Sequence, residues 1–210
     1  MALVCLAACT GDESGNEAPV VQLGAPGESG RPLSEDEVRE LGGAPAAEPT
    51  EADVAFVQNM IPHHQQALVM TAMVTDRTAS RDVRLLAQRM DVSQRDEIRQ
   101  LEGWLVSHGH EASTRHGHHD AQHAELMPGM LTDDELSRLE SARGPAFDRL
   151  FLQFMIRHHE GAVFMVSELF TDGGGQEPSA FQLAQHIDSD QRVEIARMRT
   201  MLAGLQAGSR

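Results

Sequence analysis

The same helical pattern occurs twice in the chain, and this duplication restricts the fold more than any other feature. Residues 59–70 read NMIPHHQQALVM, and residues 154–165 read FMIRHHEGAVFM. Around each motif, apolar residues and the first histidine of the pair recur at spacings of four and three, which is typical of one buried face of a packed helix. These positions are Phe56, Met60, His63, Ala67, Met70 and Val74 in the first copy, and Phe151, Met155, His158, Ala162, Met165 and Leu169 in the second.

The segments that follow the two motifs resemble each other as well. LAQRMDVSQRDEI (86–98) and LAQHIDSDQRVEI (183–195) agree at most positions, and both carry apolar residues at helical spacing. Each copy is therefore read as one helical hairpin, and no strand pattern competes with this reading. Two such hairpins predict an all-α fold, a four-helix bundle with approximate twofold symmetry.

Local signals mark the ends of the predicted helices. Thr50 with Asp53 forms a capping signal, Ser80 precedes the second helix, and Pro178 opens the last one. Pro62 lies inside the first helix, where it predicts a kink. The predicted bundle covers residues 50–206, divided into repeat 1 (about 50–107), a His-rich linker (108–131), a short helix (132–143) and repeat 2 (about 146–206).

The N-terminal part of the chain has a different composition. Residues 10–49 are rich in Gly, Pro, Glu, Ala and Ser and show little periodicity, which predicts a flexible tether with at most a short helix at 34–41. Residues 6–9, LAAC, resemble the lipobox of bacterial lipoproteins, in which the cysteine, here Cys9, is lipidated. Residues 1–9 would then be a signal segment, and the protein would be exported and membrane-anchored on the extracytoplasmic side.

Two observations oppose the lipoprotein interpretation. The apolar run before Cys9 is short, and no basic segment precedes it. Either the true start of the protein lies upstream, or this terminus is apolar by chance. No apolar run approaches the roughly 18 residues that cross a bilayer, so a lipid anchor is the only membrane attachment that we predict.

The charge balance disfavours several classes of partner. The chain has 32 acidic and 17 basic residues, for a net charge of −15. Such a surface repels nucleic acid and anionic lipid, whereas it attracts cations. We recognise neither a nucleophile–base pair nor a nucleotide-binding loop, so the sequence does not favour an enzyme. The oligomeric state stays open.

The duplicated motif predicts a polar cluster in the middle of the bundle. The helical spacing turns the first histidine of each pair inward and places the second on its flank. Folding each hairpin about its loop brings Gln and Glu of the second helix to the same level. The predicted metal ligands are His63, His64, His158, His159, Met60 and Met155. The predicted surrounding residues are Gln94, Gln191, Glu97, Glu194, Met70 and Met165.

Imidazole combined with thioether sulfur favours copper. Methionine sulfur selects the cuprous ion, and imidazole binds copper, zinc or nickel. Two histidines without cysteine are weak ligands for structural zinc. A di-iron carboxylate site needs Glu-x-x-His on two helices, and the sequence has none. The alternative is a metal-free core of hydrogen-bonded His, Gln and Glu, because a duplication copies a structural motif as faithfully as a functional one.

The predicted linker carries a second group of histidines. In a flexible acidic loop these side chains can chelate Cu(II), Ni(II) or Zn(II) weakly. The alternative is a solvated spacer in which the histidines have no role. The residues are His108, His110, His116, His118, His119 and His123.

Three motifs together indicate a known family. They are the run from Phe147-Asp148 to Met165, MPGML (127–131), and the Q-R-x-E-I-x-x-M pattern at 191–198. Over roughly residues 50–205 the chain resembles the bacterial "domain of unknown function 305" family. The resemblance implies a ferritin-like four-helix bundle, commonly exported, with copper associated with some members.

The resemblance also implies which residues form the family signature. These are His63, His64, His158 and His159, with Met60 and Met155 beside them. The two copies depart from each other next to the histidines. The first copy has Pro62 and Gln65-Gln66, whereas the second has Arg157 and Glu160-Gly161, which puts the equivalence of the two half-sites in question.

The sequence therefore favours one function and leaves two others open. We expect an exported, lipid-anchored protein that sequesters or hands over copper outside the cytoplasmic membrane. The alternative from a different class is a metal-free helical interaction module on the cell surface. A redox enzyme that uses bound copper is the third reading and has the least support.

Overall fold

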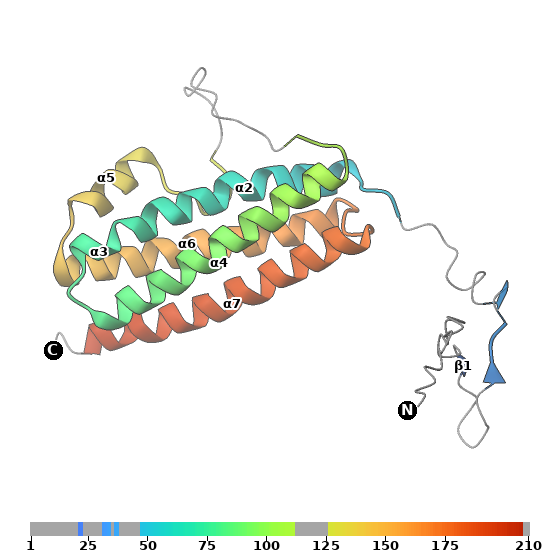
Figure 1. Ribbon diagram of the computed structural model, residues 1–210. Helices are drawn as coiled ribbons and strands as arrows, with labels where there is room; N and C mark the ends of the chain where they lie inside the picture. Colours follow the sequence, from blue (N-terminus) through green and yellow to red (C-terminus); the bar gives the residue numbers. More distant parts are fainter. Residues whose placement is uncertain (1–20, 23–30, 35, 38–46, 112–125, 208–210) are drawn as a thin grey trace, which may run out of the picture. The chain divides into compact units, whose positions relative to one another are not determined.

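The computed structural model describes residues 21–22, 31–34, 36–37, 47–111 and 126–207 (Figure 1). The chain divides into two units, Met1–Pro45 and Ala46–Arg210. The second unit carries all the helices discussed below. Cys9 and the predicted signal segment lie outside the described residues, as do His116, His118, His119 and His123.

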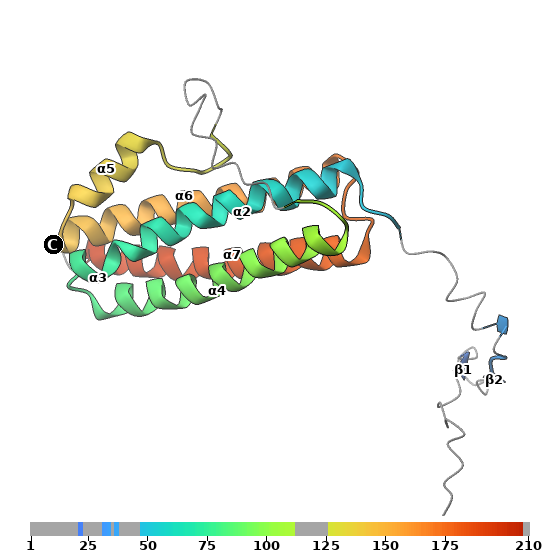
Figure 2. The ribbon, with the colours of Figure 1, turned by 45° about the horizontal axis from the view of Figure 1, so that its top comes forward.

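Four long helices make up the second unit. They lie side by side, as two views of the molecule show (Figures 1 and 2). Helix α2 packs on α4 and α6 on α7, while α2 also contacts α6 and α4 contacts α7. The predicted all-α class is confirmed. The helices are α2 (Glu51–Ala72), α4 (Arg81–Ser107), α6 (Gly144–Thr171) and α7 (Pro178–Ala207), with the shorter α3 (Val74–Arg77) and α5 (Asp133–Ser141).

Side-chain caps fix where the helices begin. Thr50 Oγ1 accepts a hydrogen bond from Asp53 N at 3.1 Å, and Asp53 Oδ2 accepts one from Thr50 N at 2.8 Å. Ser80 caps α4, and Thr132 caps α5. Such caps satisfy amides that have no acceptor within the helix, and each contributes about 1 kcal/mol. Helix α2 continues through Pro62 without interruption, and the kink there stays a prediction.

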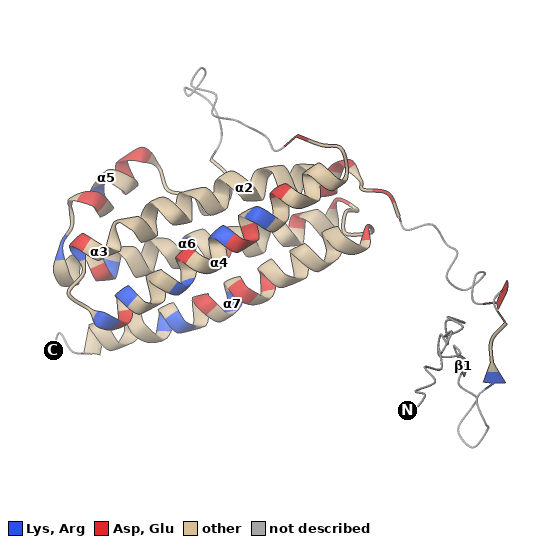
Figure 3. Ribbon diagram, viewed as in Figure 1, with Lys and Arg blue, Asp and Glu red and all other residues tan. Residues whose placement is uncertain are grey.

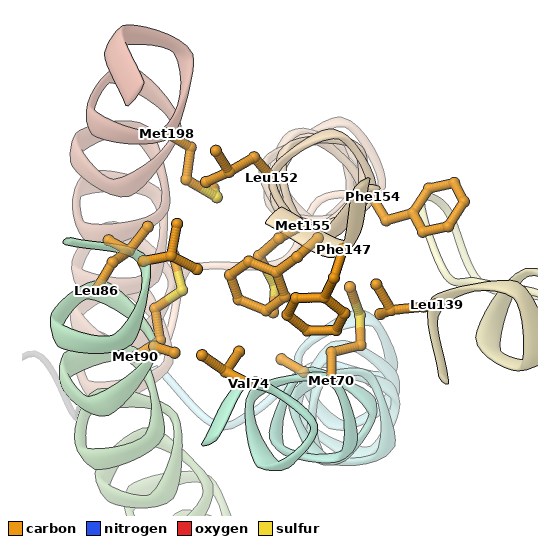
Figure 4. Packing of buried hydrophobic residues seen from close by; sticks show 14 of the residues in the cluster. Met70, Val74, Leu86, Met90, Leu139, Phe147, Leu152, Phe154, Met155 and Met198 are labelled. Carbon is orange, nitrogen blue, oxygen red and sulfur yellow. The ribbon is translucent and has the colours of Figure 1, made fainter. Parts of the chain in front are cut away.

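The apolar core of the bundle consists of two clusters at opposite ends. One cluster includes Met70, Met90, Phe147 and Met155, whose side chains meet between the helices (Figure 4). The other cluster includes Met60, and its residues come from the opposite half of each long helix. Full burial of one such side chain contributes roughly 1.5–3 kcal/mol, so both clusters hold the hairpins together. The residues between the clusters are polar, and they form the candidate site.

Two buried aspartates connect the hairpins reciprocally. Asp53, at the start of α2, accepts a hydrogen bond from Gly175 N at 2.6 Å, in the turn between α6 and α7. Asp148, at the start of α6, accepts one from the hydroxyl of Thr78, in the turn between α3 and α4. Burial raises the pKa of Asp148, and the bond from Thr78 opposes this shift. Each hairpin thus holds the turn of the other.

The outer faces of the helices carry charges of both signs. Figure 3 shows acidic and basic residues interspersed along α4 and α7. Arg95 pairs with Asp91 at 2.9 Å, and Arg192 with Asp188 at 2.7 Å, both four residues apart on one helix. Such exposed pairs contribute only about 0.3–0.5 kcal/mol each. These pairs keep the surface of the bundle polar, and they contribute too little energy to decide its fold.

The described part of the first unit contains two strands that were not predicted. β1 (Val21–Gln22) and β2 (Arg31–Pro32) pair antiparallel, with Val21 opposite Pro32. Strands of two residues produce no alternating pattern, so the sequence gives no signal for them. Asp36 and Glu37 are helical, within the predicted short helix. None of the helices in the described residues is long and apolar enough to cross a bilayer.

Candidate metal centre

The four histidines of the duplicated motif lie in the polar layer between the two apolar clusters. His63 and His159 are 0% exposed, and His64 and His158 are 1% exposed. The rings of His63 and His158, from α2 and α6, face each other with centroids 3.9 Å apart. The structure therefore brings the two inward histidines together at the centre of the bundle.

His64 and His159 are as deeply buried as their neighbours, although flanking positions were expected. Each places Nε2 2.6 Å from a glutamate oxygen, Glu97 for His64 and Glu194 for His159. The second pair is aligned as a hydrogen bond, whereas the first approaches as closely without that alignment. The carboxylates compensate the burial of the imidazoles, which a sequence pattern of apolar positions does not reveal.

These contacts determine which ring nitrogen of each histidine remains without a partner. Nε2 of His159 faces Oε2 of Glu194, and its Nδ1 is left without a partner. A carbonyl oxygen only accepts hydrogen bonds, so Pro128 O, 3.0 Å from His63 Nε2, places the hydrogen of the neutral His63 ring on Nε2 and the lone pair on Nδ1. Nδ1 of His63, His64 and His159 has no hydrogen-bond partner, and neither has Nε2 of His158. Each of the four imidazoles thus keeps at least one buried nitrogen without a hydrogen-bond partner, and in His64 this holds for both nitrogens.

Two glutamines complete the polar layer. Gln94 and Gln191 are each 1% exposed, and both have an amide atom without a hydrogen-bond partner, Oε1 of Gln94 and Nε2 of Gln191. An unsatisfied buried polar atom costs roughly 1–3 kcal/mol. Several such atoms at one level favour a ligand or bound solvent that would satisfy them.

Burial also keeps the central imidazoles neutral. Burial, with the neighbouring His64, lowers the pKa of His63 to about 3, against the opposing effect of the Pro128 carbonyl. Burial and the proximity of His63 lower the pKa of His158 well below its ordinary value. A metal binds the neutral imidazole, so protons do not compete for these nitrogens at neutral pH.

The methionines lie on both sides of the layer. Met60 and Met165 belong to one apolar cluster, and Met70 and Met155 belong to the other. Each cluster therefore receives a methionine from both copies of the motif. Within the described residues, no three His, Cys, Asp or Glu side chains form a group that could hold a metal ion by themselves. Coordination by histidine alone would thus be incomplete, and the flanking clusters contain thioether sulfur as a further donor type.

The edge of the polar layer reaches the surface between α4 and α7. Glu97 lines a surface pocket of ≈ 120 Å³ together with His186 and Asp190. Burial raises the pKa of Asp190, and the carboxylates of Glu97 and Glu194 raise it further. His186 and Asp190 were not predicted, because the first copy of the repeated segment has Arg89 and Ser93 at the equivalent positions. Glu97 is therefore the residue through which the polar layer meets this surface pocket.

Two linker histidines lie in the described residues. His108 ends α4 and packs on Trp104, with ring centroids 4.4 Å apart. Its Nδ1 lies 2.9 Å from Trp104 O, so His108 is partly engaged by the bundle. His110 follows it, and its amide donates to Leu105 O at 2.8 Å.

A further contact to the layer comes from outside the repeats. Pro128, which holds His63, belongs to the MPGML segment, and Gln66 binds the same segment through Leu131. The MPGML motif and the difference between Gln66 and Gly161 are both visible in the sequence, but nothing in the sequence connects them. The contact spans 65 residues, so no local pattern predicts it.

Comparison with known proteins agrees with the repeated helical architecture. The model of the "Domain of unknown function (DUF305)" matches residues 53–202. No curated protein matches the chain. The chain is similar to a DUF305 fragment from Deinococcus radiodurans, with 35% identity and a TM-score of 0.65 over 75% of this chain and 99% of the other.

Two further structures are similar over nearly the same length. A putative secreted DUF305 protein from Streptomyces coelicolor is 29% identical, with a TM-score of 0.63 over 74% of this chain and 94% of the other. CopM in its Cu(II)-bound form is 29% identical, with a TM-score of 0.60 over 72% and 96%. CopM structures with Cu(I) and with Ag are also similar. None of these descriptions names an enzyme, and the family match over most of the chain shows that this protein belongs to the DUF305 family.

Proposed function

We propose that this protein binds copper in the polar layer of its bundle and sequesters it or hands it over outside the cytoplasmic membrane. The proposed ligands are the unpartnered nitrogens of His63, His64, His158 and His159, together with sulfur of Met60 and Met155. One observation carries the proposal: in three of the four buried imidazoles an oxygen atom faces Nε2, while Nδ1 has no hydrogen-bond partner. Metal-ligating histidines typically have this arrangement.

The donor atoms favour copper among the divalent and monovalent metals. Thioether sulfur suits Cu(I), and neutral imidazole suits both oxidation states of copper. Similarity to CopM, which has been solved with Cu(II), Cu(I) and Ag, supports the same class of metal here. Zinc and nickel also bind imidazole, so a competition among the metals decides the specificity.

The proposed location rests on the N-terminal sequence and on one relative. Lipidation at Cys9 would attach the domain to the membrane from the extracytoplasmic side. Similarity to a putative secreted protein of the family supports export. A net charge of −15 would concentrate cations near the bundle, and the pocket at Glu97 would admit them.

The test is direct binding to the full chain without a purification tag. Cu(I), Cu(II), Zn(II) and Ni(II) are titrated against a chromophoric competitor, and the thermal midpoint is recorded with and without each metal. A ligand that binds only the folded state raises the midpoint. Tight copper binding with a raised midpoint supports the proposal. If copper neither binds tightly nor shifts the midpoint, the polar layer is a metal-free hydrogen-bonded core.

A matched substitution locates the site. His158→Ala removes a buried imidazole of the layer, and His186→Ala removes an exposed one. We expect the first change to abolish the copper-induced rise in midpoint and the second to preserve it. Equal behaviour of both variants would place the metal elsewhere on the protein.

A further inference from the structure

The two halves of the bundle differ where the segment Met127–Leu131 docks. Gln66 of α2 holds this segment with two hydrogen bonds. Gln66 Nε2 donates to Leu131 O at 2.9 Å, and Leu131 N donates to Gln66 Oε1 at 2.7 Å. In the second copy the equivalent residue is Gly161, which has no side chain to make such a clamp.

Gly161 accommodates the same segment by leaving space for it. A Cβ atom at Gly161 would lie 1.9 Å from Pro128 O, and one at Gly129 would lie 2.4 Å from Arg157 O. Gly129 also has a φ of 78°, a conformation that favours glycine. The backbones of the segment and α6 are therefore in contact, and a larger residue at either position would separate them.

Arg157 anchors the chain just beyond the segment. It stands where the first copy has Pro62, and its two terminal nitrogens donate to the two carboxylate oxygens of Glu135, each at 2.6 Å. Bidentate pairs of this kind fix geometry as well as adding energy. Glu135 itself belongs to the cap of α5. The two repeats differ at Pro62 and Arg157 and again at Gln66 and Gly161. Both differences thus concern the stretch of chain from residue 127 to residue 135.

The docked segment reaches His63, one of the two central histidines. Pro128 O accepts a hydrogen bond from His63 Nε2, which leaves the lone pair of His63 on the buried Nδ1. In His158 the unpartnered nitrogen is Nε2. We infer that Met127–Leu131 is a positioning segment that makes the two half-sites unequal, so that His63 offers Nδ1 and His158 offers Nε2 to copper.

The two parts of this inference rest on different grounds. The tautomer of His63 in the metal-free protein follows from the contact with Pro128. The choice of ligand atoms rests on the proposed copper binding. Loss of the oxygen atom that orients a metal-ligating histidine lowers metal affinity roughly 10- to 100-fold. Gln66 and Gly161 are therefore positioning residues, which act on the metal through Pro128 and His63.

The first experiment compares two neighbouring glutamines in the full-length protein. Gln66→Met removes the clamp and keeps the side-chain length, whereas Gln65→Met changes an exposed neighbour. Nitrogen-15 NMR of the imidazole rings reads the tautomer without metal. We expect the hydrogen of His63 on Nε2 in the wild type and in Gln65→Met, and a mixture of tautomers in Gln66→Met. The affinity for Cu(I) should fall roughly 10- to 100-fold in Gln66→Met alone.

A glycine pair tests the same segment from the side of α6. Gly161→Ala forces the segment away, whereas a Cβ atom at Gly103 meets nothing within 4 Å, so Gly103→Ala serves as its control. We expect the tautomer mixture and the affinity loss only in Gly161→Ala. If Gln66→Met or Gly161→Ala does not fold, the wild-type spectrum still decides the tautomer.

The outcomes separate this inference from the proposed function. A hydrogen on Nδ1 of His63 in the wild type would overturn the inference. So would unchanged tautomers and affinities in both folded variants. A wild type that shows the expected tautomers but binds no Cu(I) supports the positioning segment and contradicts the proposed copper site.

Discussion

The rings of His63 and His158 lie in contact, with centroids 3.9 Å apart and planes tilted by 39°, in the middle of a helical bundle. They come from equivalent positions of two repeats, on α2 and α6. Burial lowers the pKa of both rings, so they meet as neutral groups without charge repulsion. The two residues therefore act as one unit, and a change in either alters the surroundings of the other.

Copper binding should show this coupling. If His63 and His158 share one ion, His63→Ala and His158→Ala should each weaken binding strongly. The double variant should lose much less than the sum of the two, because the first change already breaks the site. Isothermal titration with Cu(I) on the four proteins of the cycle measures the coupling. Strictly additive losses would mean that the two histidines bind metal independently or not at all.

The contact between Thr78 and Asp148 should stabilise the fold. Thr78→Val removes the hydroxyl that donates to the buried Asp148 and leaves this carboxyl unsatisfied. We expect the free energy of unfolding to fall by about 1–3 kcal/mol, measured by urea denaturation. Thr75→Val, at an exposed position in α3, is the matched control and should change stability little. Equal effects of the two substitutions would argue against a structural role for this contact.

Glu177 should make stability depend on pH in the acidic range. Burial raises the pKa of Glu177, but hydrogen bonds from Ser179, Trp104 Nε1 and the Ala180 amide outweigh this and bring the pKa down from 4.5 to about 2. The unfolded chain then binds more protons below 4.5, so this contribution is present above pH 4.5 and is lost as the pH falls towards 2.

Glu177→Gln should therefore be less stable than the wild type at neutral pH and lose less stability between pH 4.5 and 2. Unfolding free energies across this interval, followed by the emission of Trp104, give the slope. Glu168→Gln changes an exposed glutamate of α6 and should retain the wild-type slope. A parallel pH profile for Glu177→Gln and the wild type would contradict the assigned hydrogen bonds.

The lipidation site makes a prediction about location. In a host that processes lipoproteins, the wild type should fractionate with membranes, and Cys9→Ala should be soluble with an unchanged circular dichroism spectrum. Cys5→Ala serves as the control and should remain with the membranes. Mass spectrometry of the wild type should detect the lipid. An unlipidated, soluble wild type would contradict the predicted anchor.

The linker histidines should add a weak Cu(II) site that is separate from the bundle. His108 packs on Trp104, the single tryptophan of the chain, so Cu(II) bound near His108 should quench its emission. A variant with alanine at His116, His118, His119 and His123 should lose the low-affinity quenching and keep the thermal midpoint, because these residues belong to the predicted linker and not to a predicted helix. If quenching is unaffected by these changes, the linker is a spacer without a metal role.

The helix starts could be predicted because capping depends on residues three positions apart. Thr50 with Asp53, Ser80 and Thr132 all cap helices where the sequence placed them. The repeat and the helical rise also predicted that glutamates of α4 and α7 lie near the histidines, and His64 and His159 each contact one of them. Burial of His64 was not predictable, because it depends on a glutamate from another helix that lies close enough to compensate it.

The contacts that sequence reasoning missed join residues far apart in the chain. Asp148 meets Thr78 over 70 residues, and Pro128 meets His63 over 65. One usable signal was present: Asp53 and Asp148 occupy equivalent positions of the two repeats, and both are buried. A carbonyl such as that of Pro128 gives no signal at all, because every residue has one.

The reciprocal hydrogen bonds of Asp53 and Asp148 have a consequence for the origin of the fold. Each aspartate reaches into the turn of the opposite hairpin, at Gly175 and Thr78. Two hairpins that dimerise about a twofold axis would also place each aspartate in the turn of the partner, since a self-complementary interface repeats its contacts. The bundle shows this reciprocal pattern within one chain, although the donors differ, an amide at Gly175 and a hydroxyl at Thr78. Fusion of two subunits frees each from the need to stay identical, and Gln66 and Gly161 could then diverge to receive one connecting segment.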